Sequence, residues 1–107
     1  KHWSYYMIAQ EQIIVSGKIV RLRPYTERRM KQLLEVQGDI NKYVEKHPDM
    51  SIDEIDRKMV AKWWKRKADI LWECDEELPV SFFESEDFEI TWLRKTEDFF
   101  LNSRIYL

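Results

Sequence analysis

The sequence contains very little cysteine, glycine or proline: one Cys, two Gly and three Pro in 107 residues. The single cysteine, Cys74, excludes an internal disulfide and a metal site built from several thiolates. No apolar run approaches the roughly 18 to 20 residues of a membrane-spanning helix, and no basic stretch followed by an apolar core indicates a signal peptide. These absences favour a soluble protein in a reducing, intracellular setting, with no membrane association.

The chain also lacks an excess of positive charge, because its formal net charge is −2. A dedicated nucleic-acid-binding domain usually carries a clear basic excess, so only a local patch could serve that role. Hydrophobic residues make up 44% of the chain, which is typical of a folded domain. We therefore expect a single domain over residues 1–107. The six residues before Met7 read either as native sequence or as a non-native leader.

Residues 11–23 are expected to form a β-hairpin. The stretch IIVSGKIVRLRP has β-branched runs on both sides of a Ser-Gly-Lys turn, in which Gly17 supplies the positive φ that a tight turn requires. We place the strands near residues 11–15 and 19–23. Pro24 ends the second strand because it has no N–H group for strand pairing.

Residues 26–107 are expected to be helical, with Thr26 as the N-cap of the first helix. Gly38 interrupts the apolar pattern of that helix and predicts a kink or a break. Pro48 ends it, and Ser51 with Glu54 forms a capping box that starts a second helix at residue 52, running to about residue 74. A last helix follows Pro79, capped by Ser81 or by Ser85, and the tail SRIYL is expected to be extended. The predicted fold is mainly α, with an N-terminal β-hairpin followed by about three main helices in a small bundle.

The basic stretch KWWKRK allows two interpretations. In the first, its cations neutralise phosphates while Trp63 and Trp64 stack on bases. In the second, it is a charged helix face that pairs with the acidic stretch 73–89, which contains eight acids and no base, either within the chain or in another copy. We favour the second interpretation and expect no nucleic acid as a partner. The residues proposed for self-association are Lys62, Lys65, Arg66, Lys67, Asp75, Glu76 and Glu77.

No set of residues predicts catalysis, a metal site or a cofactor. His47 precedes Pro48 at the expected end of a helix, where an imidazolium interacts well with the helix dipole, and no second histidine is placed to form a relay. Cys74 is surrounded by acids, which disfavour the thiolate. We therefore expect a protein that is not an enzyme.

Aromatic residues are concentrated in the last third of the chain, where Phe82-Phe83 and Phe99-Phe100 form adjacent pairs. Two neighbouring rings cannot both point into one small core, so each pair should leave a ring accessible. We therefore predict an apolar groove between the second and last helices. Its proposed partner-binding residues are Trp63, Trp64, Phe82, Phe83, Phe99 and Phe100.

The stretch VSGKIVRLRPYTERRMKQLL, residues 15–34, resembles the start of the tail assembly chaperones of long-tailed bacteriophages, with the lactococcal siphophage type nearest in character. The resemblance covers about 20 residues: a short strand, a Gly-Lys turn, a strand ending in LRP and a Thr-capped helix. It implies a helical protein in the host cytoplasm that binds the hydrophobic tape measure protein before tail tube subunits polymerise around it. It supplies no catalytic residue.

The resemblance also suggests how such a protein would act. Each copy would hold apolar side chains of a long helical partner in a groove, and many copies would act together by avidity. Contact between the basic stretch of one copy and the acidic stretch of the next would be head-to-tail, which generates a spiral when it does not close. The alternative function is a small nucleic-acid-binding or regulatory module that uses the basic Trp-containing helix 57–67.

Overall fold

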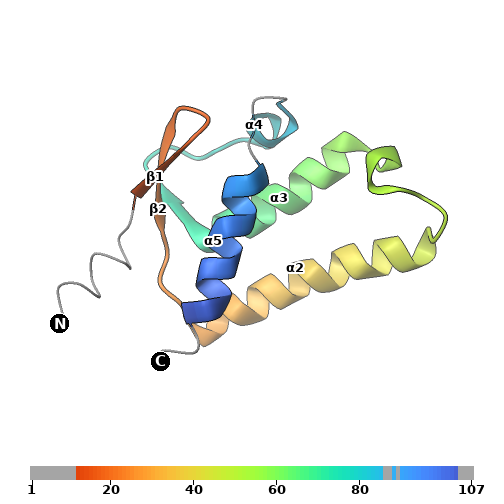
Figure 1. Cartoon of the computed structure of the whole chain (residues 1–107), viewed down its shortest axis with the longest axis horizontal. Helices are drawn as coiled ribbons and strands as arrows, with labels where there is room; N and C mark the ends of the chain where they lie inside the picture. Colours follow the sequence, from red (N-terminus) through yellow and green to blue (C-terminus); the bar gives the residue numbers. More distant parts are fainter. Residues whose placement is uncertain (1–11, 86–87, 89, 104–107) are drawn as a thin grey trace.

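The computed structural model describes residues 12–85, 88 and 90–103 (Figure 1). The fold is mainly α, with a small sheet at one end, as the sequence predicted. The possible leader at residues 1–6 and the last part of the tail, residues 104–107, lie outside the described residues.

The predicted hairpin is confirmed. Strands β1 (Gln12–Val15) and β2 (Lys18–Leu22) pair antiparallel, with Val15 opposite Lys18. The turn residues Ser16 and Gly17 both have positive φ, at 49° and 82°, which is the requirement of a two-residue turn matched to the twist of the strands.

A third strand, β3 (Trp72–Cys74), pairs antiparallel with β2 and gives the order β1-β2-β3. The prediction that the second helix continues to about residue 74 is therefore wrong at its end. The backbone N–H of Arg23 donates to Leu71 O at 2.8 Å, and Trp72 is already extended. Pairing with β2 satisfies backbone groups that a longer helix would otherwise have used.

Helix α2 (Glu27–Lys46) begins as predicted, because Thr26 Oγ1 accepts a hydrogen bond from Arg29 N–H at 3.1 Å. The helix is continuous through Gly38, so a break at that residue, one of the two predicted alternatives, is wrong, and a kink there stays a prediction. A Cβ atom at Gly38 would meet nothing within 4 Å, so close packing does not explain the glycine.

Helix α3 (Arg57–Leu71) starts later than predicted. Its N-cap is Asp56, whose Oδ1 accepts from Lys58 N–H at 3.0 Å. Ser51 is not the cap: residues Ile52–Glu54 form a short 3₁₀ helix, in which Ser51 O accepts from Glu54 N–H at 3.0 Å. The single last helix of the prediction is two helices, α4 (Val80–Glu84) and α5 (Ile90–Ser103).

Helix α3 is the centre of the bundle, because it packs against α2, α4 and α5 (Figure 1). Helices α2 and α3 run antiparallel, and α5 crosses them near the sheet. The buried Trp72 indole donates from Nε1 to Thr96 Oγ1 at 2.9 Å, which ties β3 to α5. None of the helices in the described part of the chain is long and apolar enough to cross a membrane. The buried core consists mainly of Val15, Val20, Leu22, Met30, Leu33, Ala61, Ala68, Leu71, Trp72, Leu78, Phe83, Leu93 and Phe100.

Candidate functional site

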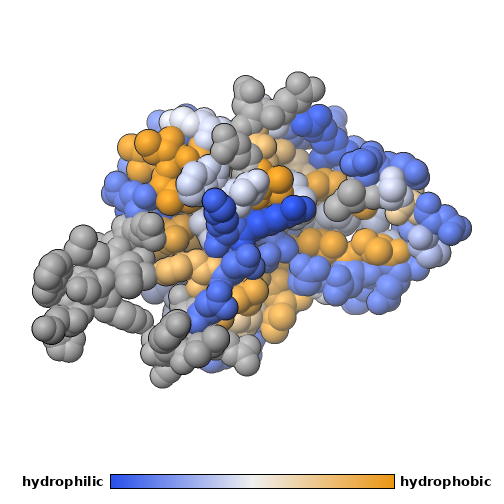
Figure 2. Space-filling view, viewed as in Figure 1, coloured by the Kyte–Doolittle hydropathy of each residue, from blue (hydrophilic) through white to orange (hydrophobic). Residues whose placement is uncertain are grey.

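An apolar cleft of about 250 Å³ lies between the second half of α2 and the first half of α3. All of its lining side chains are aliphatic, aromatic or thioether groups, with no charged residue among them. In Figure 2, apolar surface appears between these two helices and over the hairpin, with hydrophilic residues around much of it. The cleft is lined by Ile40, Val44, Met50, Ile55, Val60, Trp63 and Trp64.

The two walls of this cleft are apolar side chains spaced one helical turn apart on α2 and on α3. Ile40 and Val44 lie one turn apart on α2, and Val60 and Trp64 lie one turn apart on α3. Val44 remains 48% exposed even though it is a large apolar residue on a regular helix. The apolar edge of α2 is therefore accessible to a partner at this point.

The connection between the helices closes one end of the cleft and holds its shape. Met50 and Ile55 come from this connection, and Tyr43 Oη lies 3.9 Å from Met50 Sδ. The Tyr43 ring also meets Trp63 edge-on, with ring centroids 5.5 Å apart. Trp63 is only 8% exposed, so it forms the floor of the cleft, whereas Trp64 is half-buried.

The other four proposed binding residues do not line the cleft. Phe83 is buried against Trp72, with ring centroids 6.4 Å apart, and Phe82 packs edge-on against Phe83 at 5.2 Å. Phe100 is buried and stacks at a tilt on Tyr25, with centroids 5.1 Å apart. Phe82 and Phe99 are half-buried. Each adjacent pair thus contributes one ring to the core, and a partner-binding role for the other ring stays a prediction.

Most cations of the basic stretch, residues 62–67, contact groups of the same chain. Lys65 Nζ donates to Leu78 O at 2.8 Å and lies 3.3 Å from Glu77 Oε1. Arg66 Nη1 lies 2.8 Å from Asp39 Oδ2 on α2. Lys62 is exposed and has no ion pair among the described residues.

Lys67 makes the most buried of these ion pairs. Its side chain is 7% exposed, its Nζ lies 3.0 Å from Glu97 Oε2 on α5, and it donates to Gln37 Oε1 on α2 at 2.9 Å. One ammonium group therefore connects three helices. Removing one partner of such a pair leaves a poorly solvated charge, so Lys67 has a structural role.

The acidic residues proposed for self-association also have partners within the chain. Asp75 Oδ1 lies 2.6 Å from Arg21 Nη2, and Glu76 Oε2 lies 3.5 Å from Lys18 Nζ. Glu77 contacts Lys65 as described above. Only the Lys65–Glu77 pair joins the basic stretch to the acidic stretch among the described residues, because Asp75 and Glu76 pair with β2 instead. Pairing between copies through these residues stays a prediction.

No protein-family model, no curated protein and no solved structure matches this chain.

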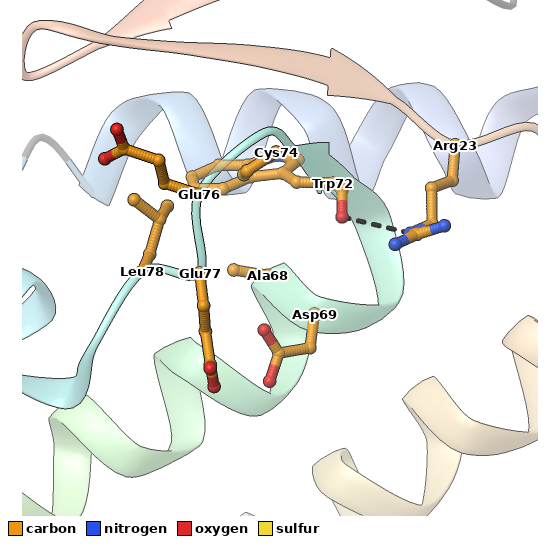
Figure 3. A pocket seen from close by; sticks show the side chains of 8 residues that line it. All are labelled: Arg23, Ala68, Asp69, Trp72, Cys74, Glu76, Glu77 and Leu78. Carbon is orange, nitrogen blue, oxygen red and sulfur yellow. Dashed lines mark hydrogen bonds between the residues drawn. The ribbon is translucent and has the colours of Figure 1, made fainter.

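Cys74 lies beside a second hollow, of about 330 Å³, which Figure 3 shows with Arg23 at one side and Glu76 and Glu77 at the other. Burial raises the pKa of the Cys74 thiol, and Arg23 opposes this effect to a smaller extent. The thiol is therefore protonated at neutral pH and is a poor nucleophile. Within the described part of the chain, no group of three or more His, Cys, Asp or Glu residues is placed to hold a metal ion.

The sequence analysis named Trp63 and Trp64, which line the cleft, but did not name the other five lining residues, and a binding role for any of them stays a prediction. The signal was present: Ile40 and Val44 on one helix and Val60 and Trp64 on the next repeat at helical spacing. This spacing predicts an apolar stripe on each helix. It cannot tell which part of the stripe the neighbouring helix leaves uncovered.

Proposed function

We propose that this protein binds an apolar helical segment of another polypeptide in the cleft between α2 and α3. The observation that carries the proposal is the all-apolar lining of the cleft, together with the 48% exposure of Val44 at its edge. Burying one Leu or Phe side chain contributes roughly 1.5 to 3 kcal/mol. A cleft of this size gives modest affinity for each copy, so firm binding requires several copies on one partner.

The resemblance of residues 15–34 to phage tail assembly chaperones supports a specific partner, the hydrophobic tape measure protein. In this proposal the protein acts in the host cytoplasm and keeps that long helical chain soluble before the tail tube polymerises. A charged residue content of 36% suits this task, because dense surface charge keeps a protein with an exposed apolar site in solution. Many copies along one chain would supply the avidity.

A nucleic-acid-binding function has less support. Binding of nucleic acid by the basic stretch required both Trp rings and all four cations of residues 62–67 at the surface. Trp63 and Lys67 are buried, and Lys65 and Arg66 contact acids of the same chain. Within residues 62–67, Lys62 is the cation that is exposed and forms no ion pair with a described residue, which is little charge for a phosphate-binding surface.

Two substitutions on α2 test the proposal as a matched pair. Val44→Asp places a carboxylate at the edge of the cleft, whereas Leu34→Asp places one at a 61% exposed position outside it. Neither side chain is buried, so both variants should keep the wild-type thermal midpoint. When each is co-expressed with a tape-measure-like apolar helical polypeptide, Val44→Asp should lose capture at least tenfold and Leu34→Asp should retain it.

Equal loss in both variants would mean that general surface hydrophobicity, not the cleft, holds the partner. Full capture by Val44→Asp would refute the cleft as the binding site. The salt response gives an independent check, because apolar binding should persist at high salt, whereas binding to a polyanion falls steeply.

A further inference from the structure

Two hollows of opposite charge lie next to each other on the surface beside β3. The first, shown in Figure 3, is lined by Asp69, Glu76 and Glu77 with Arg23. The second, of about 420 Å³, has Arg23 and Asp69 in common with it. The second hollow is lined by Arg23, Thr26, Arg28, Arg29, Gln32, Asp69 and Ile70. The two shared residues carry opposite charges and form the boundary between a basic and an acidic half.

The basic half consists of the guanidinium groups of three arginines. None of Arg23, Arg28 and Arg29 forms an ion pair with a described residue. Two of them are held in place by main-chain oxygens: Arg23 Nε donates to Trp72 O at 3.0 Å, and Arg29 Nη1 donates to Pro24 O at 2.9 Å. Each guanidinium keeps further N–H groups free to donate to a carboxylate.

The acidic half is open to a partner. The side chains of Glu76 and Glu77 are 79% and 83% exposed, and their contacts with Lys18 and Lys65 measure 3.5 and 3.3 Å. Exposed contacts of this length contribute little to stability. Both carboxylates therefore have oxygen atoms available for a better donor.

We propose that these two halves form a self-complementary surface through which two copies of the chain pair about a two-fold axis. A rotation of 180° about an axis near the boundary of Arg23 and Asp69 exchanges the halves. It brings Arg28 and Arg29 of one copy opposite Glu76 and Glu77 of the other, and it does so twice in the same interface.

The closeness of the two halves distinguishes this pairing from a head-to-tail array. An open array needs its two complementary patches on different faces, so that a second contact remains free after the first has formed. Here both patches adjoin the same two residues, so one partner covers both. The contact closes as a dimer, and this dimer would be the unit that lines an extended partner. The pairing does not depend on the α2–α3 cleft, which none of these residues lines.

Charge reversal tests the pairing directly. The basic-side variant is Arg28→Glu with Arg29→Glu, and the acidic-side variant is Glu76→Arg with Glu77→Arg. Sedimentation velocity of the full chain should show a concentration-dependent dimer for the wild type, weakened at high salt. Each variant alone should weaken dimerisation at least tenfold, because like charges then face each other. Lys62→Glu, a reversal at an exposed position outside both hollows, should leave the dimer unchanged.

Recombining the charges makes the test specific. A mixture of the two variants should form mixed dimers, and a chain carrying all four substitutions should pair with itself again. Circular dichroism identifies any variant that fails to fold; Arg28→Glu alone, at an exposed residue, then replaces the basic-side pair. A monomeric wild type at every concentration, or a dimer insensitive to the reversals, would overturn the proposal. Assemblies larger than dimers in the mixture of the two variants would also overturn it. The same holds for a wild-type monomer whose arginines bind inorganic pyrophosphate or an acidic peptide instead of a second copy.

Discussion

Replacing Gly38 by alanine should stabilise the protein. Gly38 lies inside the continuous helix α2, and a Cβ atom there would meet nothing within 4 Å. The substitution therefore adds no clash and removes the conformational freedom of glycine from the unfolded chain. Alanine is favoured over glycine in a helix interior by about 1 kcal/mol. For a domain of this size, that gain raises the thermal midpoint by roughly 4 to 8 °C.

The other glycine of the chain provides the control. Gly17 also has open space around its Cβ position, but its φ is +82°, so the backbone alone disfavours a side chain. Gly17→Ala should therefore destabilise the protein by about 1 to 2 kcal/mol. Urea and thermal unfolding followed by circular dichroism measure both variants. If Gly38→Ala lowered the midpoint, the backbone at residue 38 would not be a regular helix, and the break predicted from the sequence would be present.

Two further predictions concern a helix cap and a thiol. Asp56→Ala removes the N-cap of α3 and should destabilise the protein by about 1 kcal/mol in urea unfolding. Ser51→Ala should have a much smaller effect, because only the main chain of Ser51 takes part in the 3₁₀ turn. A larger effect for Ser51→Ala than for Asp56→Ala would mean that Ser51 is the cap after all. Because burial raises the pKa of the Cys74 thiol, iodoacetamide should alkylate the folded protein quickly only at a higher pH than it does the urea-unfolded chain. For the same reason the free energy of unfolding should fall as the pH rises above the ordinary thiol pKa of about 8.5, because the thiol then ionises more readily in the unfolded chain. Identical pH profiles for folded and unfolded chains would contradict the effect of burial.

Local signals predicted the parts of the fold that short-range chemistry decides. The turn at Gly17 and the cap at Thr26 each depend on neighbouring residues only, and both were predicted correctly. The start of α3 was predicted wrongly because two acceptable caps, Ser51 and Asp56, lie five positions apart. The connection from α2 settles into a 3₁₀ turn at the first and leaves the second as the cap.

Strand β3 could not be predicted from its own residues. Trp72 continues the apolar stripe of α3, and a helix-favouring pattern surrounds it. What makes it a strand is pairing with β2, with Leu22 opposite Trp72 and Val20 opposite Cys74, about 50 positions away in the chain. The cleft was missed for a similar reason, since the exposure of Val44 depends on how far the neighbouring helix extends over it.

The pairing of β2 with β3 has a consequence for how the cleft can move. It fixes the chain just before α2 and just after α3, since Leu22 lies opposite Trp72 and Arg23 N–H donates to Leu71 O. At their other end the two helices are joined by the connection at residues 47–56, which supplies Met50 and Ile55 to the cleft, and by the edge-on contact of Tyr43 with Trp63. The hydrogen bonds of the sheet lie at the first end, so a slight separation of the helices at the far end would widen the cleft without breaking a strand hydrogen bond. We therefore expect the far end of the cleft to adjust its width more readily than the end beside the sheet, which would let one site take apolar side chains of different sizes.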